Sequence, residues 1–152
     1  MKAEKSAARL PDCRGKRFAI VVARFYPELT DNLVDGARRA LRDCGVAEGS
    51  VETFDVPGCF ELPLAAFNLI EREQYDGIVA LGVVIRGDTP HFDYVAGQCA
   101  RGIMDVQLAT GTPIGFGVLT TENFEQAEER ADPARGDKGY EAAIATASLA
   151  VL

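Results

Sequence analysis

The sequence has no tryptophan, only one histidine and only two methionines among its 152 residues. It also lacks any stretch near the roughly 18 uninterrupted apolar residues that a membrane-spanning helix needs, so we expect no membrane partner. Hydrophobic residues make up 47% and charged residues 26% of the chain, which is typical of a globular protein rather than a disordered one. A chain of this length is predicted to form one domain with a full hydrophobic core.

The N-terminal segment differs in charge from the rest of the chain. Residues 1–17 contain six basic and two acidic residues and carry +4, so residues 18–152 carry −11 of the total −7. The segment has no apolar core for a secretory signal, and Glu4 and Asp12 interrupt the pattern of a transit peptide or nucleic-acid tail. We predict an N-terminal arm, 1–17, that docks on a neighbouring subunit, and a single domain, 18–152. The acidic domain argues against nucleic acid as the main partner.

The cysteines form no C-x-x-C pair, and the single histidine does not stand at metal-ligand spacing from any of them. Such thiols are typical of a reduced, cytosolic protein, so we predict a cytoplasmic location and no metal site. The cysteines are Cys13, Cys44, Cys59 and Cys99.

Patterns of buried strands and amphipathic helices alternate along the chain. Apolar runs rich in branched residues predict strands over 17–25, 51–56, 76–85 and 113–120. Helical spacing of apolar residues predicts helices over 30–45, 61–73, 90–111, 122–131 and 139–152. This alternation predicts an α/β fold of three layers, α/β/α, with a four-stranded parallel sheet of the flavodoxin-like kind.

Local signals predict where three of these helices begin or end. Thr30 or Asp31 is expected to cap the first helix, and Gly45 to end it. Pro63 suits the first turn of the second helix, whereas Thr89 can cap the third.

The segments that follow the strands of a parallel sheet meet at one edge, where ligands bind. Here they read "RFYPE", "VPGCFE", "IRGDTPH" and "LTTEN". Together they supply aromatic rings, a carboxylate, hydroxyls and an imidazole, a set that suits a polar ligand with a ring. The edge gathers Phe25 and Tyr26, Cys59 to Glu61, Arg86 to His91, and Thr120 to Asn123.

The segment "GDTPH" has the makings of an anion site. Pro90 fits the first helical position after a Thr89 cap, and Gly87 allows close approach of a ligand to the backbone. The free N–H groups of the turn and the helix dipole suit an anion the size of phosphate. An imidazole, whose ordinary pKa is about 6.5, both gives and takes protons near neutral pH. From the residues alone, His91 is either that proton carrier or an ordinary residue at a helix start.

Other candidates also have structural alternatives. Phe25 is equally a strand-end core residue, and Glu61 a first-turn carboxylate that complements the helix dipole. Arg130 and Lys138, in a polar loop, are equally solvated charges. Glycine-rich nucleotide motifs are not complete anywhere, since "GFGVLT" has no third glycine and lies within a strand.

Five blocks of the sequence, in order and with matching spacing, resemble the lumazine synthases of riboflavin biosynthesis. They are "ARFY", "VPGCFELP", "ALGVVIRGDTPHFDYV", "FGVLTTENFEQAEERA" and "GDKGYEAA". The resemblance extends from about residue 17 to the end of the sequence. It implies a transferase that condenses 5-amino-6-(D-ribitylamino)uracil with 3,4-dihydroxy-2-butanone 4-phosphate. The products would be 6,7-dimethyl-8-ribityllumazine, phosphate and water, in the penultimate step of the pathway, with no metal or organic cofactor.

The resemblance also assigns roles to individual residues. Phe25 would stack on the pyrimidine, and His91 would be the catalytic proton carrier. Glu61 and the backbone of Gly58, Cys59 and Phe60 would hold the ribityl hydroxyls. Val83, Val84 and Ile85 would offer main-chain groups to the pyrimidine, and Gly87, Asp88 and Thr89 would form the phosphate turn.

The family builds this site between adjacent subunits of a homopentamer. The neighbour would then supply Phe116, Arg130 and Lys138, with Arg130 pairing the phosphate. Three residues depart from the family's common pattern. Tyr26 stands where many members have Asn, Cys59 replaces Ala, and Asp88 replaces a small residue; we expect the Asp88 side chain to point outward.

Two alternatives remain at this stage. One is an archaeal-type riboflavin synthase, although the intact "GDTPHFDY" block favours lumazine synthase. The other is a catalytically weak paralogue that binds flavin or forms a shell, to which only Tyr26 and Asp88 point. The sequence leaves open a pentamer, a decamer or a shell of sixty subunits.

Overall fold

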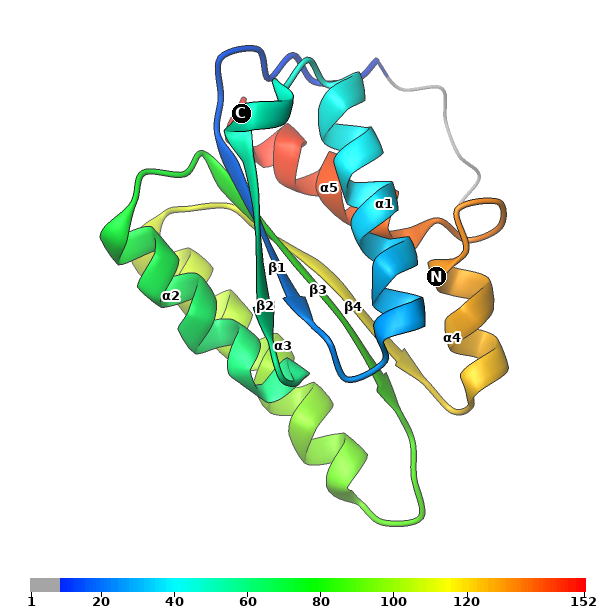
Figure 1. Ribbon diagram of the computed structural model, residues 1–152. Helices are drawn as coiled ribbons and strands as arrows, with labels where there is room; N and C mark the ends of the chain where they lie inside the picture. The colour runs from blue at the N-terminus through cyan, green and yellow to red at the C-terminus, as the bar shows by residue number, and fades with distance from the viewer. Residues whose placement is uncertain (1–8) are drawn as a thin grey trace.

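The computed structural model of the protein describes residues 9–152, and residues 1–8 of the predicted arm lie outside this range. A single parallel sheet runs through the middle of the fold in the order β2-β1-β3-β4 (Figure 1). Its strands are β1 (Phe18–Ala23), β2 (Val51–Val56), β3 (Gly77–Ile85) and β4 (Ile114–Thr121). Each predicted strand is present, with ends that differ by only a few residues.

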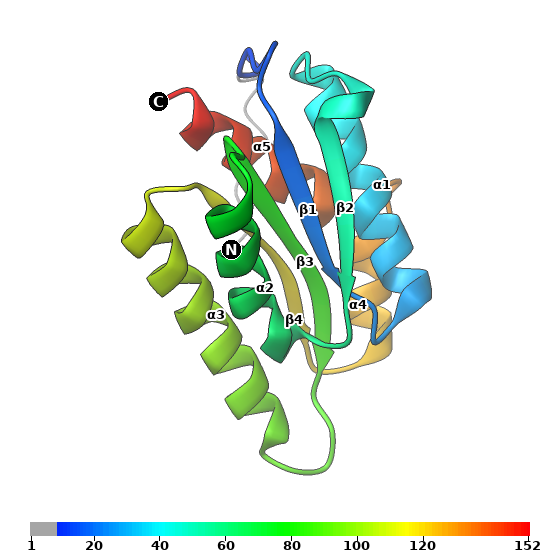
Figure 2. The same cartoon turned by 60° about the vertical axis from the view of Figure 1, so that its left-hand side comes forward.

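The helices cover both faces of the sheet. They are α1 (Pro27–Asp43), α2 (Leu62–Arg72), α3 (His91–Thr110), α4 (Phe124–Ala131) and α5 (Lys138–Ala150), with short 3₁₀ turns at Glu48–Ser50 and Cys59–Glu61. Figures 1 and 2 show α2 and α3 on one face and α1, α4 and α5 on the other. The predicted three-layer α/β/α fold with a four-stranded parallel sheet is confirmed. None of the helices in residues 9–152 is both long and apolar enough to cross a membrane.

Side chains of the central strands alternate between two cores. Phe18, Ile20 and Val22 of β1 pack with α1 and α5. Ala19 and Val21 of the same strand pack with α2 and α3. Both sets are fully buried, which explains why β1 is a continuous apolar run rather than an alternating one.

The glycines of "GFGVLT" serve packing rather than nucleotide binding. A Cβ atom built on Gly115 would lie 2.6 Å from the carbonyl oxygen of Ala142 in α5. Because a side chain at this position would collide with the helix backbone, α5 can lie directly on β4 only over glycine.

The predicted cap of the first helix is wrong. The helix starts at Pro27, and the buried Thr30 is inside it, where its hydroxyl donates to the carbonyl oxygen of Tyr26 at 3.1 Å. A hydroxyl bonded back by four residues belongs to a helix interior, and Pro27 is the start signal. Gly45, with φ of +88°, follows the helix end as predicted.

The start of α3 also differs slightly from the prediction. Pro90 occupies the cap position and His91 is the first helical residue, with no side-chain cap hydrogen bond. Thr89 Oγ1 lies 3.4 Å from the main-chain N of His91, a distance too long for a strong cap. Pro63 lies in the first turn of α2 as expected.

Candidate active site

Two aromatic side chains are exposed at the carboxyl ends of β1 and β2. Phe25 is 71% exposed and Phe60 is 61% exposed, although both are large apolar rings. Tyr26 is half-buried against the core, and its ring meets Phe25 edge-on at a centroid distance of 5.0 Å. Phe25 is therefore a supported, exposed ring rather than the core residue of the alternative interpretation, and its open face is suited to stacking.

The turn after β2 places a thiol inside and a carboxylate outside. Cys59 is buried against β3, where a Cβ atom on Gly82 would come within 2.5 Å of its sulfur. Burial raises the pKa of the Cys59 thiol to about 11, so this thiol is a packing group and not a nucleophile. Glu61 is exposed, and its main-chain N donates to the Gly58 carbonyl oxygen at 3.2 Å. The carboxylate remains available to hydroxyl groups of a ligand.

The last residues of β3 extend beyond β1, as Figure 1 shows. The β1–β3 ladder ends at the Val22–Leu81 pair, whereas the β3–β4 ladder continues to Ile85 and Thr121. Main-chain groups of the β3 segment 83–85 on the β1 side therefore have no strand partner in the described chain. Such groups can bond a planar ring that carries amide-like donors and acceptors.

His91 and the turn before it are exposed at the same edge of the sheet. Gly87, Asp88 and Thr89 are also exposed, and a Cβ atom on Gly87 would have no other group within 4 Å. The amides at the start of α3 thus face open space, where an anion could reach them. Asp88 has no ion pair with any residue of 9–152, and its expected outward orientation stays a prediction.

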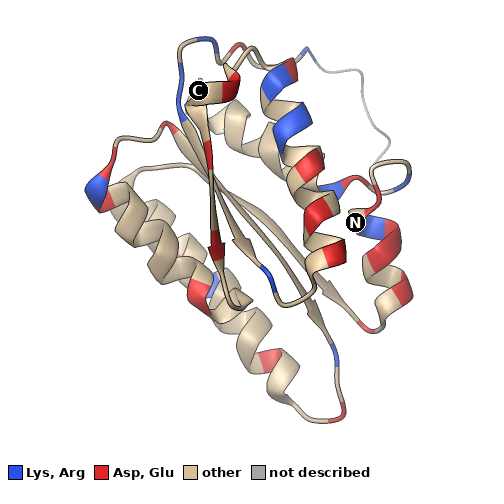
Figure 3. Ribbon diagram, in the orientation of Figure 1, with Lys and Arg blue, Asp and Glu red and all other residues tan. Residues whose placement is uncertain are grey.

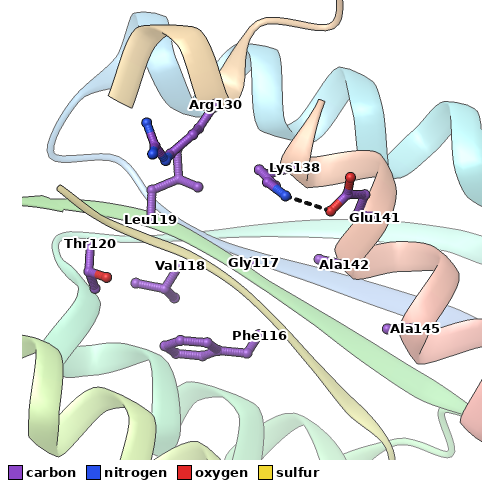
Figure 4. Close-up of a pocket in the computed structure, with 10 residues that line it drawn as sticks. All are labelled: Phe116, Gly117, Val118, Leu119, Thr120, Arg130, Lys138, Glu141, Ala142 and Ala145. Carbon is purple, nitrogen blue, oxygen red and sulfur yellow. Dashed lines mark hydrogen bonds and ion pairs between the residues drawn. The ribbon is translucent and has the colours of Figure 1, made fainter. Parts of the chain in front are cut away.

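A second group of candidates lines a pocket at the exposed edge of β4. The pocket has a volume of about 390 Å³, and its lining includes Phe116, Arg130, Lys138 and Glu141. Figure 4 shows the Arg130 and Lys138 side chains on one side of β4 and the Phe116 ring on the other. Phe116 is 46% exposed. An aromatic ring and two cations thus line one pocket, whose lining includes neither His91 nor Phe25.

The two cations of this pocket differ in how they are paired. Lys138 Nζ lies 2.8 Å from the Glu141 carboxylate. Arg130 donates to the Gln126 carbonyl oxygen at 3.0 Å, and within residues 9–152 it forms no ion pair. Arg130 is therefore the better candidate for binding an anion. Glu141 was not predicted from the sequence, although its spacing of three residues from Lys138 on a helix could have indicated it.

Asp137 fixes the start of α5 and hence the position of Lys138. It has φ of +49°, unlike any other non-glycine residue that the structure describes. Its carboxylate lies 2.7 Å from the guanidinium of Arg39 on α1, and its Oδ1 lies over Gly36. A left-handed aspartate is thus held in place by an ion pair beside the β4 pocket.

Two substitutions should measure the energetic cost of the left-handed backbone conformation at Asp137. Both Asp137→Ala and Asp137→Gly lose the ion pair with Arg39, but only glycine adopts a positive φ without strain. The Gly variant should therefore be the more stable by about 1 kcal/mol. Urea unfolding at one fixed protein concentration measures this difference. Equal stability of the two variants would show that the left-handed conformation relaxes at no cost.

The β4 pocket and the edge that carries His91 share none of the predicted site residues within one chain. Phe116 pairs with Ala80, which is five residues before the last pair of the β3–β4 ladder, Ile85 with Thr121. Because a strand advances about 3.3 Å per residue, Phe116 lies roughly 16 Å before the edge at which the His91 turn begins. In one chain, the structure brings Phe116, Arg130 and Lys138 together, and gathers the remaining candidates at the carboxyl ends of β1, β2 and β3.

Potential metal ligands are not clustered in the described chain: residues 9–152 contain no group of three His, Cys, Asp or Glu side chains that could hold an ion. All four cysteines are buried and free. Burial raises the pKa of Cys44 to about 11 and that of Cys99 to about 12, so these thiols are also packing groups.

A parallel three-layer α/β fold with an imidazole, open helix amides and exposed rings at the carboxyl ends of its strands defines an enzyme for small polar molecules. The chain belongs to the 6,7-dimethyl-8-ribityllumazine synthase family. The model of that family matches residues 15–152. A 6,7-dimethyl-8-ribityllumazine synthase from Desulfatibacillum aliphaticivorans is 48% identical over 130 residues, which are 86% of this chain and 84% of that relative. The resemblance seen in the sequence is confirmed, and the protein is a transferase of this family.

Proposed function

We propose that the protein makes 6,7-dimethyl-8-ribityllumazine at a site completed by a neighbouring copy of the chain, with His91 as the proton carrier. The substrates are 5-amino-6-(D-ribitylamino)uracil and 3,4-dihydroxy-2-butanone 4-phosphate. The observation that carries the proposal is the division of the family's site residues into two separate groups within one chain. One copy would supply the carboxyl ends of β1, β2 and β3, and the neighbour would supply the β4 pocket.

The first copy would bind the pyrimidine substrate and, at the phosphate turn, the phosphate group of the second substrate. Phe25 stacks on the pyrimidine ring, whose edge bonds the main chain of Val83, Val84 and Ile85. Glu61 and the backbone from Gly58 to Phe60 hold the ribityl hydroxyls. Asp88 and Thr89 belong to the turn whose amides receive the phosphate.

The neighbour would supply the remaining contacts. Arg130 pairs with the phosphate, and its freedom from any carboxylate in residues 9–152 supports this role. Phe116 and Lys138 enclose the bound pair of substrates. Enclosure and orientation of two reactants supply the larger share of the rate enhancement.

The reaction needs proton transfers at each stage. The amine of the uracil condenses with the ketone to form an imine and water. Removal of a carbon-bound proton then lets the carbon–oxygen bond break and phosphate leave. Phosphate loss leaves an enol, which tautomerises to a ketone as a proton returns to carbon. The ribitylamino nitrogen attacks this new carbonyl, and loss of a second water closes the ring. One imidazole that accepts and returns protons serves all these stages, and the buried thiols take no part as nucleophiles.

The uncovered faces of the chain support an oligomer. Figure 3 shows that charges gather on α1 and α4, whereas α2 and α3 are mostly uncharged. Exposed large apolar residues on these two helices are Leu64, Phe67, Tyr94, Met104 and Leu108. A surface of this kind is costly to leave in water, and a homopentamer or a multiple of it would cover it. The free buried thiols are in keeping with a cytoplasmic location.

Incubation with both substrates tests the activity directly. The protein should produce fluorescent lumazine and inorganic phosphate in equal amounts. A riboflavin synthase would instead consume lumazine and yield riboflavin, and a flavin-binding paralogue would yield neither product. The mass of the particle in solution separates a pentamer from a decamer or a sixty-subunit shell.

A mixing experiment tests the shared site. The His91→Ala and Arg130→Ala variants are unfolded together in equal amounts and reassembled. If the two residues act across an interface, roughly a quarter of the interfaces should regain both wild-type groups, because ring order is heterologous. Activity at low concentrations of the phosphate substrate should then exceed that of either parent.

A second mixture provides the control. Wild-type chains are mixed with equal amounts of the double variant, which carries both substitutions. A shared site predicts that roughly a quarter of the sites are fully wild-type, whereas a site within one chain predicts about half. The first mixture could instead show only the mean activity of its parents, although mass measurement confirms that its rings contain both variants. In that case the site lies within one chain.

A further inference from the structure

Arg86, the residue after β3, contacts three elements around the phosphate turn. Its main-chain N donates to the Thr121 carbonyl oxygen at 2.9 Å. Its side chain donates to the Glu122 carboxylate at 2.8 Å and to the Asp93 carboxylate at 3.3 Å. The guanidinium carbon also lies 4.3 Å from the centre of the Phe92 ring. Arg86 thus joins the end of β3, the first turn of α3 and the end of β4.

These contacts enclose the turn that carries the anion site. Residues 87–91 begin directly after Arg86, and the turn ends where Phe92 and Asp93 meet its guanidinium. All five turn residues are exposed. Within the described chain, the turn's internal side-chain bond is the 3.4 Å contact from His91 N to Thr89 Oγ1, which is weak by its length. The turn therefore depends on its two ends for a fixed shape.

We propose that Arg86 is a positioning residue for the reaction, which holds the phosphate turn and the His91 imidazole in their working geometry by clamping the first turn of α3 to β4. The proposal rests on the proposed function, because that function gives the turn and His91 their roles. The Arg86 guanidinium donates to Glu122 and Asp93 and lies over the Phe92 ring, so we assign it the holding of these groups rather than contact with substrate. Only a planar guanidinium can stack on a ring and bond two carboxylates together.

The chain provides a closely matched control at the opposite end of the sheet. Arg17 pairs with Glu52 and, at 2.8 Å, with Glu73. Its guanidinium carbon lies 4.6 Å from the centre of the Tyr75 ring. The Arg17 side chain is 37% exposed and that of Arg86 is 38% exposed. Replacement of Arg17 removes the same kinds of contact but leaves the phosphate turn, residues 87–91, unchanged.

The test compares Arg86→Ala, Arg86→Lys and Arg17→Ala in the assembled protein. Steady-state kinetics give the KM of each substrate separately. Diethyl pyrocarbonate acylates the chain's single histidine, and mass analysis of its peptide gives the rate with and without inorganic phosphate. In Arg86→Ala, the KM of the phosphate substrate should rise about tenfold, the size expected if the loss of one charge-assisted contact in the clamp is passed on to phosphate binding, while that of the pyrimidine stays within about twofold. Protection of His91 against acylation should likewise need about tenfold more inorganic phosphate in this variant than in the wild type.

Arg86→Lys should recover little of either loss, because the charge alone does not rebuild the clamp. Arg17→Ala should lower the thermal midpoint about as much as Arg86→Ala does, with wild-type kinetics and protection. If Arg86→Ala does not fold, Arg86→Lys carries the test. Equal rises of both KM values, full rescue by lysine, or the same losses in Arg17→Ala would overturn the proposal. If the wild type makes no lumazine, the proposed function fails, while protection of His91 by phosphate still tests Arg86.

Discussion

Replacement of His91 by alanine should lower kcat about a hundredfold, within the range of general acid–base catalysis, and leave the KM of both substrates nearly unchanged. His91 is the chain's single histidine and lies exposed at the first position of α3. Its removal deletes the proposed proton carrier but none of the groups proposed to hold the two substrates together. The remaining rate comes from that positioning. Steady-state kinetics with each substrate varied in turn measures both constants.

Chemical rescue provides the control for this variant. Imidazole added to the solution can enter the space left by the side chain and should restore part of kcat in His91→Ala without changing the wild type. Because the side chain is exposed, the thermal midpoint of the variant should match that of the wild type. A variant that turns over at the wild-type rate would make His91 an ordinary residue at a helix start.

The strands were predictable because the apolar runs that form them are buried on both faces. β2 has the predicted bounds, and β3 and β4 begin one residue later than expected. The start of α1 was missed because threonine is a residue type common at helix N-caps. Only its burial in the structure shows that Thr30 lies inside the helix. Pro27 carried the correct signal, since proline favours the first helical position.

The site was predictable in composition but not in arrangement. Parallel topology places Phe25, Glu61 and His91 at one edge of the sheet without further information. The extension of β3 beyond β1 depends on strand register, which the sequence of either strand leaves open. The clamp of Arg86 depends on Glu122, a residue that only tertiary folding brings near. Long-range pairing of this kind has no local pattern in the sequence.

Replacement of Arg130 by alanine should raise the KM of the butanone phosphate about ten- to hundredfold, the loss expected for a charge-assisted pair with phosphate. The pyrimidine should bind nearly as before, because its proposed contacts come from Phe25 and the end of β3. In residues 9–152 no carboxylate competes for the Arg130 guanidinium, which donates only to the Gln126 carbonyl oxygen. Initial rates with one substrate saturating and the other varied separate the two effects.

Arg135 is the matched control for Arg130, since it lies in the next loop but is already paired. Its guanidinium lies 2.9 Å from Asp132 and 3.9 Å from Glu128, so carboxylates of the same chain already balance its charge. Arg135→Ala should therefore leave both KM values near those of the wild type, with at most a small loss of stability. If Arg130→Ala instead raises both KM values equally, or if Arg135→Ala reproduces its effect, Arg130 acts by shaping the fold around the end of α4. Selective weakening of the phosphate substrate by Arg130→Ala alone would place this guanidinium on the phosphate.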